Sequence, residues 1–117
     1  MPIDLDAISG SRRRGQRTAL RLACTAVLPG DVQRSVVSCD LGAEGLSFLS
    51  AVPMAPGTRC RLSFDLPQGA SSVTVRAQVK TLYSSFVASR SFRIGAVFTE
   101  LDAASATALR DYLALDA

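Results

Sequence analysis

Histidine is absent from this sequence of 117 residues, and its absence narrows the chemistry that the chain can perform. Without histidine there is neither the most common metal ligand nor the usual general base, so no imidazole can activate the numerous serines. The sequence also contains no Walker-type loop and no paired carboxylates. We therefore expect no catalytic residue, no metal site and no cofactor, and we do not expect an enzyme.

Cysteine is scarce, and its spacing excludes two further classes of protein. The sequence contains three cysteines, Cys24, Cys39 and Cys60. This number is odd, the three residues lie far apart, and no two of them form a CxxC pair. Each lies in an apolar or alternating segment, which favours buried free thiols. A disulfide scaffold or a zinc site is therefore not expected.

Long hydrophobic runs are missing as well. No apolar run reaches the length of about 18 residues that a transmembrane helix needs. Residues 1–11 carry Asp4 and Asp6 and lack the apolar stretch of a secretory signal, so we predict a cytoplasmic protein. A composition that is 48% hydrophobic and 20% charged is typical of a globular protein. We expect a flexible tail over residues 1–11 and one domain over residues 12–117.

What the sequence does contain is a repeated alternation of apolar and polar residues, which is typical of strands with one buried face. It predicts strands over residues 20–28, 33–39, 45–50, 59–66, 72–83 and 92–98. Near the end the period changes: Asp102 is placed to cap a helix whose apolar stripe contains Leu109, Tyr112 and Leu113. We predict an all-β fold, a barrel or a sandwich. We favour a six-stranded antiparallel β-barrel with one C-terminal α-helix, because a closed barrel leaves fewer open edges.

The positive charge of the chain is concentrated in the segment Arg12-Arg13-Arg14-Gly15-Gln16-Arg17. The formal net charge is +3, and without these four arginines nine basic residues face ten acidic ones. A guanidinium group offers a planar fork of donors that binds phosphate in two places. The cluster therefore indicates an anion-binding segment, although a solvated basic tail or a non-specific nucleic-acid patch would have the same composition.

A second candidate motif is Asp40-Leu41-Gly42-Ala43-Glu44-Gly45, between two predicted strands. Two glycines three residues apart indicate a tight turn that needs positive φ or a close approach of the backbone. An ordinary Asx-type turn would explain Asp40 and both glycines. Alternatively, the Asp40 carboxylate accepts hydrogen bonds from a ligand, and it matches the N1–H and exocyclic amine of guanine.

Taken together, the two motifs resemble those of the PilZ domain family. Arg13 and Arg17 match the family's RxxxR, and Asp40 to Gly45 resembles its [D/N]xSxxG. The segment Phe92–Phe98 is similar to the closing strand of the family, and the resemblance extends over roughly residues 10–115. The resemblance implies a six-stranded barrel with a C-terminal helix that binds the bacterial second messenger cyclic di-GMP.

The resemblance also implies the ligand contacts. We carry over Arg13, Arg17, Asp40 and Gly45 as contacts, with Arg12 and Arg14 as additional arginines and Gly42 as a backbone contact. Gly42 stands where the family has serine. The missing hydroxyl costs on the order of 1 kcal/mol, or several-fold in affinity, which weakens binding without abolishing it.

The expected role is that of a receptor that passes the signal to an effector protein, in motility, pilus or virulence regulation. The alternative is a PilZ-like adaptor that binds protein and no nucleotide. Nucleic acid is a less favoured partner, because the five Phe and two Tyr fall mostly at inward positions and leave few rings for base stacking.

Overall fold

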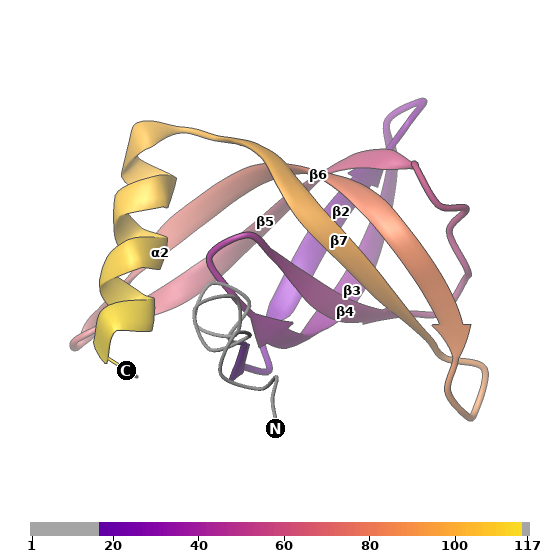
Figure 1. Cartoon of the computed structure of the whole chain (residues 1–117), viewed down its shortest axis with the longest axis horizontal. Helices are drawn as coiled ribbons and strands as arrows, with labels where there is room; N and C mark the ends of the chain where they lie inside the picture. Colours follow the sequence, from indigo (N-terminus) through magenta and orange to yellow (C-terminus); the bar gives the residue numbers. More distant parts are fainter. Residues whose placement is uncertain (1–16, 116–117) are drawn as a thin grey trace, which may run out of the picture.

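The computed structural model describes residues 17–115, which form an antiparallel β-barrel followed by one helix (Figure 1). The elements are β1 (Thr18–Ala19), β2 (Ala23–Leu28), β3 (Val32–Leu41), β4 (Gly45–Ser50), β5 (Arg59–Gln68), β6 (Ser71–Phe86), β7 (Phe92–Leu101) and α2 (Ala103–Leu115). The strand order is β1-β3-β2-β5-β6-β7-β4, and β4 also pairs with β3. This last pairing closes a barrel of six strands, with β1 as an extra strand on β3, so the predicted fold is confirmed.

The strand predicted over residues 20–28 begins only at Ala23, and hydrogen bonds with a serine on β3 accompany the break at residues 20–22. The Ser38 hydroxyl accepts a hydrogen bond from the Leu22 N–H at 2.8 Å and donates one to the Leu20 carbonyl. A side chain thus replaces part of the backbone ladder between β1 and β2. The alternation was read correctly, because Cys24 and Ala26 are buried, but it gave no sign of this break.

Strand β6 is longer than predicted and contains a bulge. Thr81 lies opposite Ala96, whereas Tyr83 lies opposite Gly95, so Leu82 is an extra residue in the ladder. The bulge reverses the alternation, and Tyr83 therefore faces outward although odd-numbered residues before it are buried. The prediction of a connector from residue 84 onward is wrong for 84–86, which continue the strand.

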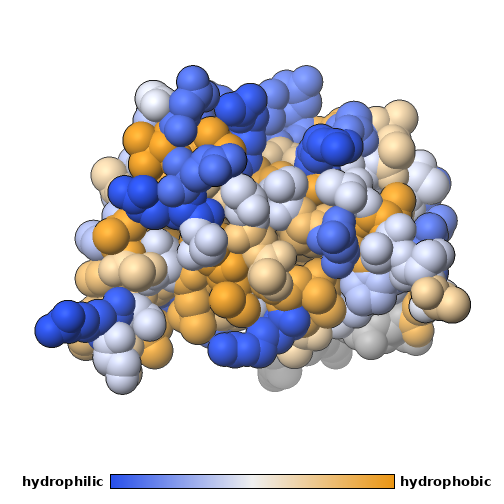
Figure 2. All heavy atoms as spheres, turned by 180° about the vertical axis from the view of Figure 1, so that it is seen from behind, coloured by the Kyte–Doolittle hydropathy of each residue, from blue (hydrophilic) through white to orange (hydrophobic). Residues whose placement is uncertain are grey.

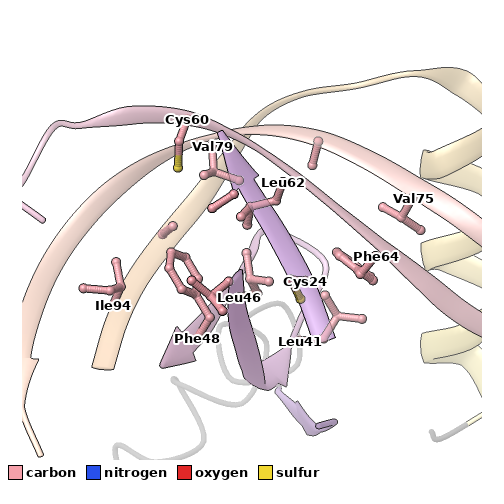
Figure 3. Close-up of a cluster of buried hydrophobic side chains, with 14 of the residues drawn as sticks. Cys24, Leu41, Leu46, Phe48, Cys60, Leu62, Phe64, Val75, Val79 and Ile94 are labelled. Atoms are coloured by element: carbon pink, nitrogen blue, oxygen red, sulfur yellow. The ribbon is translucent and has the colours of Figure 1, made fainter. Parts of the chain in front are cut away.

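The core fills the barrel with side chains from all six of its strands (Figure 3). Among the labelled side chains are Cys24, Leu41, Leu46, Phe48, Cys60, Leu62, Phe64, Val75, Val79 and Ile94, all of which are buried. The predicted free thiols are confirmed, with Cys24 and Cys60 buried and Cys39 half-buried. Burial raises the pKa of Cys24 to about 11, although a hydrogen bond from Ser38 lowers it.

The C-terminal helix begins as predicted. The Asp102 carboxylate accepts a hydrogen bond from the Ser105 N–H at 2.7 Å, which is an N-cap contact. Helix α2 packs against β5 and β6, where Ala108 and Leu109 are buried. Within residues 17–115, no helix is long and apolar enough to cross a membrane.

Two views show how the outside of the barrel is arranged. From the front, β4 lies beside β3 and β7, while β2 and β5 are farther back (Figure 1). From behind, hydrophilic and hydrophobic groups are mixed across the surface (Figure 2). The candidate site described below lies where β3, β4 and β7 meet.

Gly45 is required where β4 meets β7. An ideal Cβ on this residue would lie 2.1 Å from the Ala96 carbonyl oxygen and 2.9 Å from the Val97 Cα. The predicted close approach of the backbone is therefore correct for Gly45. The alternative, positive φ, is wrong for both glycines of the motif, because neither Gly42 nor Gly45 is among the glycines with positive φ. The clash is with backbone of the neighbouring strand, which cannot move without disturbing the barrel.

We predict that Gly45→Ala lowers the free energy of unfolding by about 3 kcal/mol, the upper end of overpacking effects. Urea denaturation measures this change. Gly57→Ala is the control, because a Cβ there meets nothing within 4 Å and the cost of about 1 kcal/mol comes only from φ of +87°. Equal losses in the two variants would contradict the close packing of Gly45.

Candidate functional site

The centre of the candidate site is the Asp40 carboxylate, which two arginines hold. Arg17 Nη1 lies 3.0 Å from Asp40 Oδ1, and Arg93 Nη2 lies 2.7 Å from Asp40 Oδ2. The Asp40 side chain is 19% exposed, whereas those of Arg17 and Arg93 are 38% and 44% exposed. Each carboxylate oxygen thus accepts a charge-assisted hydrogen bond from a group that keeps much of its contact with solvent.

Strand pairing brings Arg17 to Asp40. In the short strand β1, Thr18 lies opposite Leu41 and Ala19 opposite Asp40, so Arg17 lies just beyond the paired residues. These two residues are 23 positions apart in the chain and come from the two separate motifs. The structure therefore brings together one residue of each predicted motif.

The turn after Asp40 is fixed at both ends. The Gly42 N–H donates to the Gly45 carbonyl at 2.8 Å, and the Phe98 N–H donates to the Glu44 carbonyl at 2.8 Å. Within residues 17–115, both oxygens of Asp40 are hydrogen-bonded to arginines and neither to the backbone of the turn. Asp40 is therefore not the acceptor of an Asx-type turn, and its carboxylate lies on the outer face of the barrel.

Arg93 is a member of the site that the motifs did not identify. It lies on β7 between the inward-facing Phe92 and Ile94, so the alternation alone places it outside. Partial desolvation lowers the pKa of Arg93, but the electrostatic interactions with Cys39, Asp40 and Tyr83 and the hydrogen bond to Asp40 outweigh this effect. The net pKa is raised, which keeps this guanidinium charged beside the carboxylate.

An aromatic ring borders the same area. Asp40 lies opposite Ser47, Ser47 opposite Gly95 and Gly95 opposite Tyr83, so a single row crosses β3, β4, β7 and β6. The Tyr83 ring lies directly on Gly95, because an ideal Cβ there would be 2.1 Å from the ring Cε2. Tyr83 is 45% exposed and offers an aromatic surface beside the ion pairs.

This arrangement is suited to the binding of a charged ligand. It combines two guanidinium groups, one carboxylate and one aromatic ring, which can bind a ligand that has both an anionic group and a planar polar base. Within the described part of the chain, no group of three or more Cys, Asp or Glu side chains could hold a metal ion.

The remaining predicted contacts are divided between two regions. Gly42 and Gly45 lie at the two ends of the turn that follows β3, and both are buried. Arg12, Arg13 and Arg14 lie outside the described residues, as does the predicted tail over residues 1–11. Their contacts with a ligand, and those of Gly42 and Gly45, stay predictions.

Solved structures that are similar to this chain include the following two. The inhibitor of motility MotI/DgrA from Bacillus subtilis matches with a TM-score of 0.71 and 18% identity, over 82% of this chain and 46% of that one. The PlzA protein of Borreliella burgdorferi, solved in complex with c-di-GMP, matches with a TM-score of 0.56 and 17% identity, over 92% of this chain and 44% of that one. This chain spans less than half of either protein, and at these identities the likeness shows the fold alone.

Sequence comparison identifies the family. No curated protein matches the chain. Residues 11–115, by contrast, match the model of the PilZ domain, in agreement with the resemblance of the two motifs. Because this match extends over nearly the whole sequence, the chain belongs to the PilZ domain family.

Proposed function

We propose that this PilZ domain is a non-catalytic receptor that binds cyclic di-GMP and passes the signal to an effector protein. The observation that carries the proposal is the contact between Arg17 and Asp40, at 3.0 Å. In this contact, the last arginine of the cluster lies next to a carboxylate that can accept hydrogen bonds from a guanine edge. PlzA, a protein of similar fold, was solved with c-di-GMP, which supports this choice of ligand.

The charges of the site match the charges of the ligand. Cyclic di-GMP carries two phosphates and two guanines. Arginines at positions 12, 13, 14 and 17 supply the donors for the phosphates, and Arg93 adds a fifth guanidinium on the barrel. The Asp40 carboxylate accepts from the N1–H and amine of one guanine, and the Tyr83 ring provides a surface for stacking.

We expect binding to involve an exchange at Asp40, because each of its oxygens already accepts a hydrogen bond from an arginine. Ion pairs with partly exposed arginines are worth only about 0–1 kcal/mol. Replacing one of them with hydrogen bonds from guanine is therefore an inexpensive step, and the released guanidinium becomes available to a phosphate. The free protein thus keeps the carboxylate paired, and the ligand takes over one partner.

An adaptor that binds protein without nucleotide is the second candidate. Two features favour it: Gly42 lacks the hydroxyl of the family's serine, and apolar side chains are exposed near the β6–β7 hairpin. Leu82, Phe86 and Val87 are 49%, 66% and 52% exposed. Under our proposal this apolar surface serves the effector, and a role in motility, pilus or virulence regulation is part of the same proposal, since MotI is an inhibitor of motility.

The first prediction is that the chain binds cyclic di-GMP in calorimetry at moderate salt. Arg13→Ala and Asp40→Ala should each weaken binding at least tenfold, because each removes a hydrogen bond to a charged group worth about 1.5–3 kcal/mol. Arg110→Ala, an exposed position on α2, is the control and should bind as the parent does.

Two results would contradict the proposal. One is the absence of any heat of binding in the parent protein, which would favour the adaptor. The other is displacement of the nucleotide by single-stranded DNA with a steep dependence on salt, which would indicate a non-specific basic patch.

The second prediction concerns the stability of the barrel. Asp40→Asn should change the free energy of unfolding by no more than about 2 kcal/mol, because it removes two ion pairs with partly exposed arginines, each worth about 0–1 kcal/mol. Urea denaturation of the ligand-free protein measures this. A loss several times larger would show that Asp40 supports the fold rather than a ligand.

The third prediction separates the arginine cluster from the barrel. A variant that lacks residues 1–17 should remain folded, because the barrel core is formed by residues of β2 to β7, and it should lose nucleotide binding. Circular dichroism and calorimetry test the two statements separately. Unfolding after truncation would refute the division of roles between segment and barrel.

A further inference from the structure

Ser47 on β4 has an unusual environment. Its neighbours Leu46 and Phe48 are fully buried in the core, so the alternation of the strand directs Ser47 to the outer face. Ser47 is nevertheless only 2% exposed, and its hydroxyl has no hydrogen-bond partner among the described residues. A buried hydroxyl without a partner loses its bonds to water and gains nothing in return.

The other buried hydroxyl groups of the barrel all have partners. Ser38 bonds to Leu20 and Leu22, Ser50 to Val52, Thr81 to Ala55, and Ser105 to the Arg76 N–H. Within residues 17–115, the unsatisfied buried side-chain oxygen is that of Ser47. It lies in the candidate site, next to the residues that we assign to the ligand.

The register of β4 explains what covers Ser47. Strand β4 lies between β3 and β7 (Figure 1). Ser47 lies opposite Asp40 on one side and Gly95 on the other. The Arg93–Asp40 ion pair joins β7 to β3, which are two strand spacings or roughly 10 Å apart. It therefore crosses over β4 on the side to which Ser47 points, and the Tyr83 ring on Gly95 lies next to it.

Arg93 is the part of this cover that a ligand can displace. The side chain of Arg93 is 44% exposed and is held to Asp40 by one ion pair. When a ligand takes the place of Arg93 at Asp40, the same movement uncovers the Ser47 hydroxyl. Residues directly opposite in an antiparallel pair have Cβ atoms about 5 Å apart, so one base edge can reach Asp40 and Ser47 together.

We propose that Ser47 is a ligand contact that supplies, from the strand, the hydroxyl that Gly42 does not supply from the turn. The inference rests on the proposed function. The Asp40 carboxylate accepts from the N1–H and amine of a guanine, and the Ser47 hydroxyl donates to the adjacent O6 carbonyl. Arg93 is the residue that closes the site in the absence of ligand.

The test is Ser47→Ala, measured by calorimetry with cyclic di-GMP and by thermal unfolding of the ligand-free protein. We expect about a fivefold loss of affinity, the value of one neutral hydrogen bond. The melting temperature should stay the same or rise, because the substitution removes an unpaired buried hydroxyl. Ser63→Ala, on β5 opposite Thr25 and Arg76, is the matched control and should change neither quantity.

A second variant tests whether the two hydroxyl groups are interchangeable. Gly42→Ser restores the family's serine, and in the Ser47→Ala background it should return the affinity to near the parent value. In the parent background, Gly42→Ser should raise the affinity less than in the Ser47→Ala background, because Ser47 already makes the hydrogen bond to the ligand. If Gly42→Ser raised the affinity equally in both backgrounds, the two positions would act independently. That result would refute the proposal that the Ser47 hydroxyl takes the place of a hydroxyl at position 42.

The remaining outcomes distinguish the two proposals. If the parent protein binds cyclic di-GMP and Ser47→Ala binds equally well, the role of Ser47 is refuted and the proposed function stands. If Ser47→Ala lowers the melting temperature of the ligand-free protein, the hydroxyl is structural and the inference is also refuted. If the parent protein does not bind cyclic di-GMP, the proposed function fails and this inference fails with it.

Discussion

The pairing of β4 with both β3 and β7 is the constraint on which the rest of the structure depends. It closes the barrel, and it also sets Asp40 and Arg93 on opposite sides of one strand, close enough for a contact of 2.7 Å. Gly45 makes the pairing possible, because β7 lies where its side chain would be. The glycine that ends the second motif therefore has a packing role, and the aspartate that begins it projects from the resulting surface.

The alternation of apolar residues was enough to predict most of the strands, since one face is buried along β2, β5 and much of β6. The barrel was preferred to a sandwich because a closed barrel leaves fewer open edges. The N-cap at Asp102 was also readable, because capping depends on local sequence. The details that shape the site could not be predicted from the sequence. The bulge at Leu82, which turns Tyr83 outward, and the partnership of Arg93 with Asp40 both depend on the register between strands distant in sequence. That Arg17 and Asp40 belong to one site followed only from the family resemblance, which implied that both contact the same ligand; their ion pair was not predicted.

The site has three properties that favour the binding of a ligand. Its carboxylate is paired by two arginines that remain partly exposed, so the pairs contribute little to stability and can be exchanged. Its arginines supply more positive charge than one carboxylate needs, and its floor contains a hydroxyl without a partner. A ligand with two phosphates and a guanine edge satisfies all three features at once, which is why we favour a nucleotide receptor over a protein adaptor.

The most direct test of this account is an NMR titration of the labelled protein with cyclic di-GMP. The account predicts that the largest amide shifts fall on residues near Arg17, on the turn between β3 and β4, and on β7 around Arg93, while those of α2 remain almost unchanged. Shifts concentrated on α2, or no shifts at a saturating concentration of the nucleotide, would contradict it.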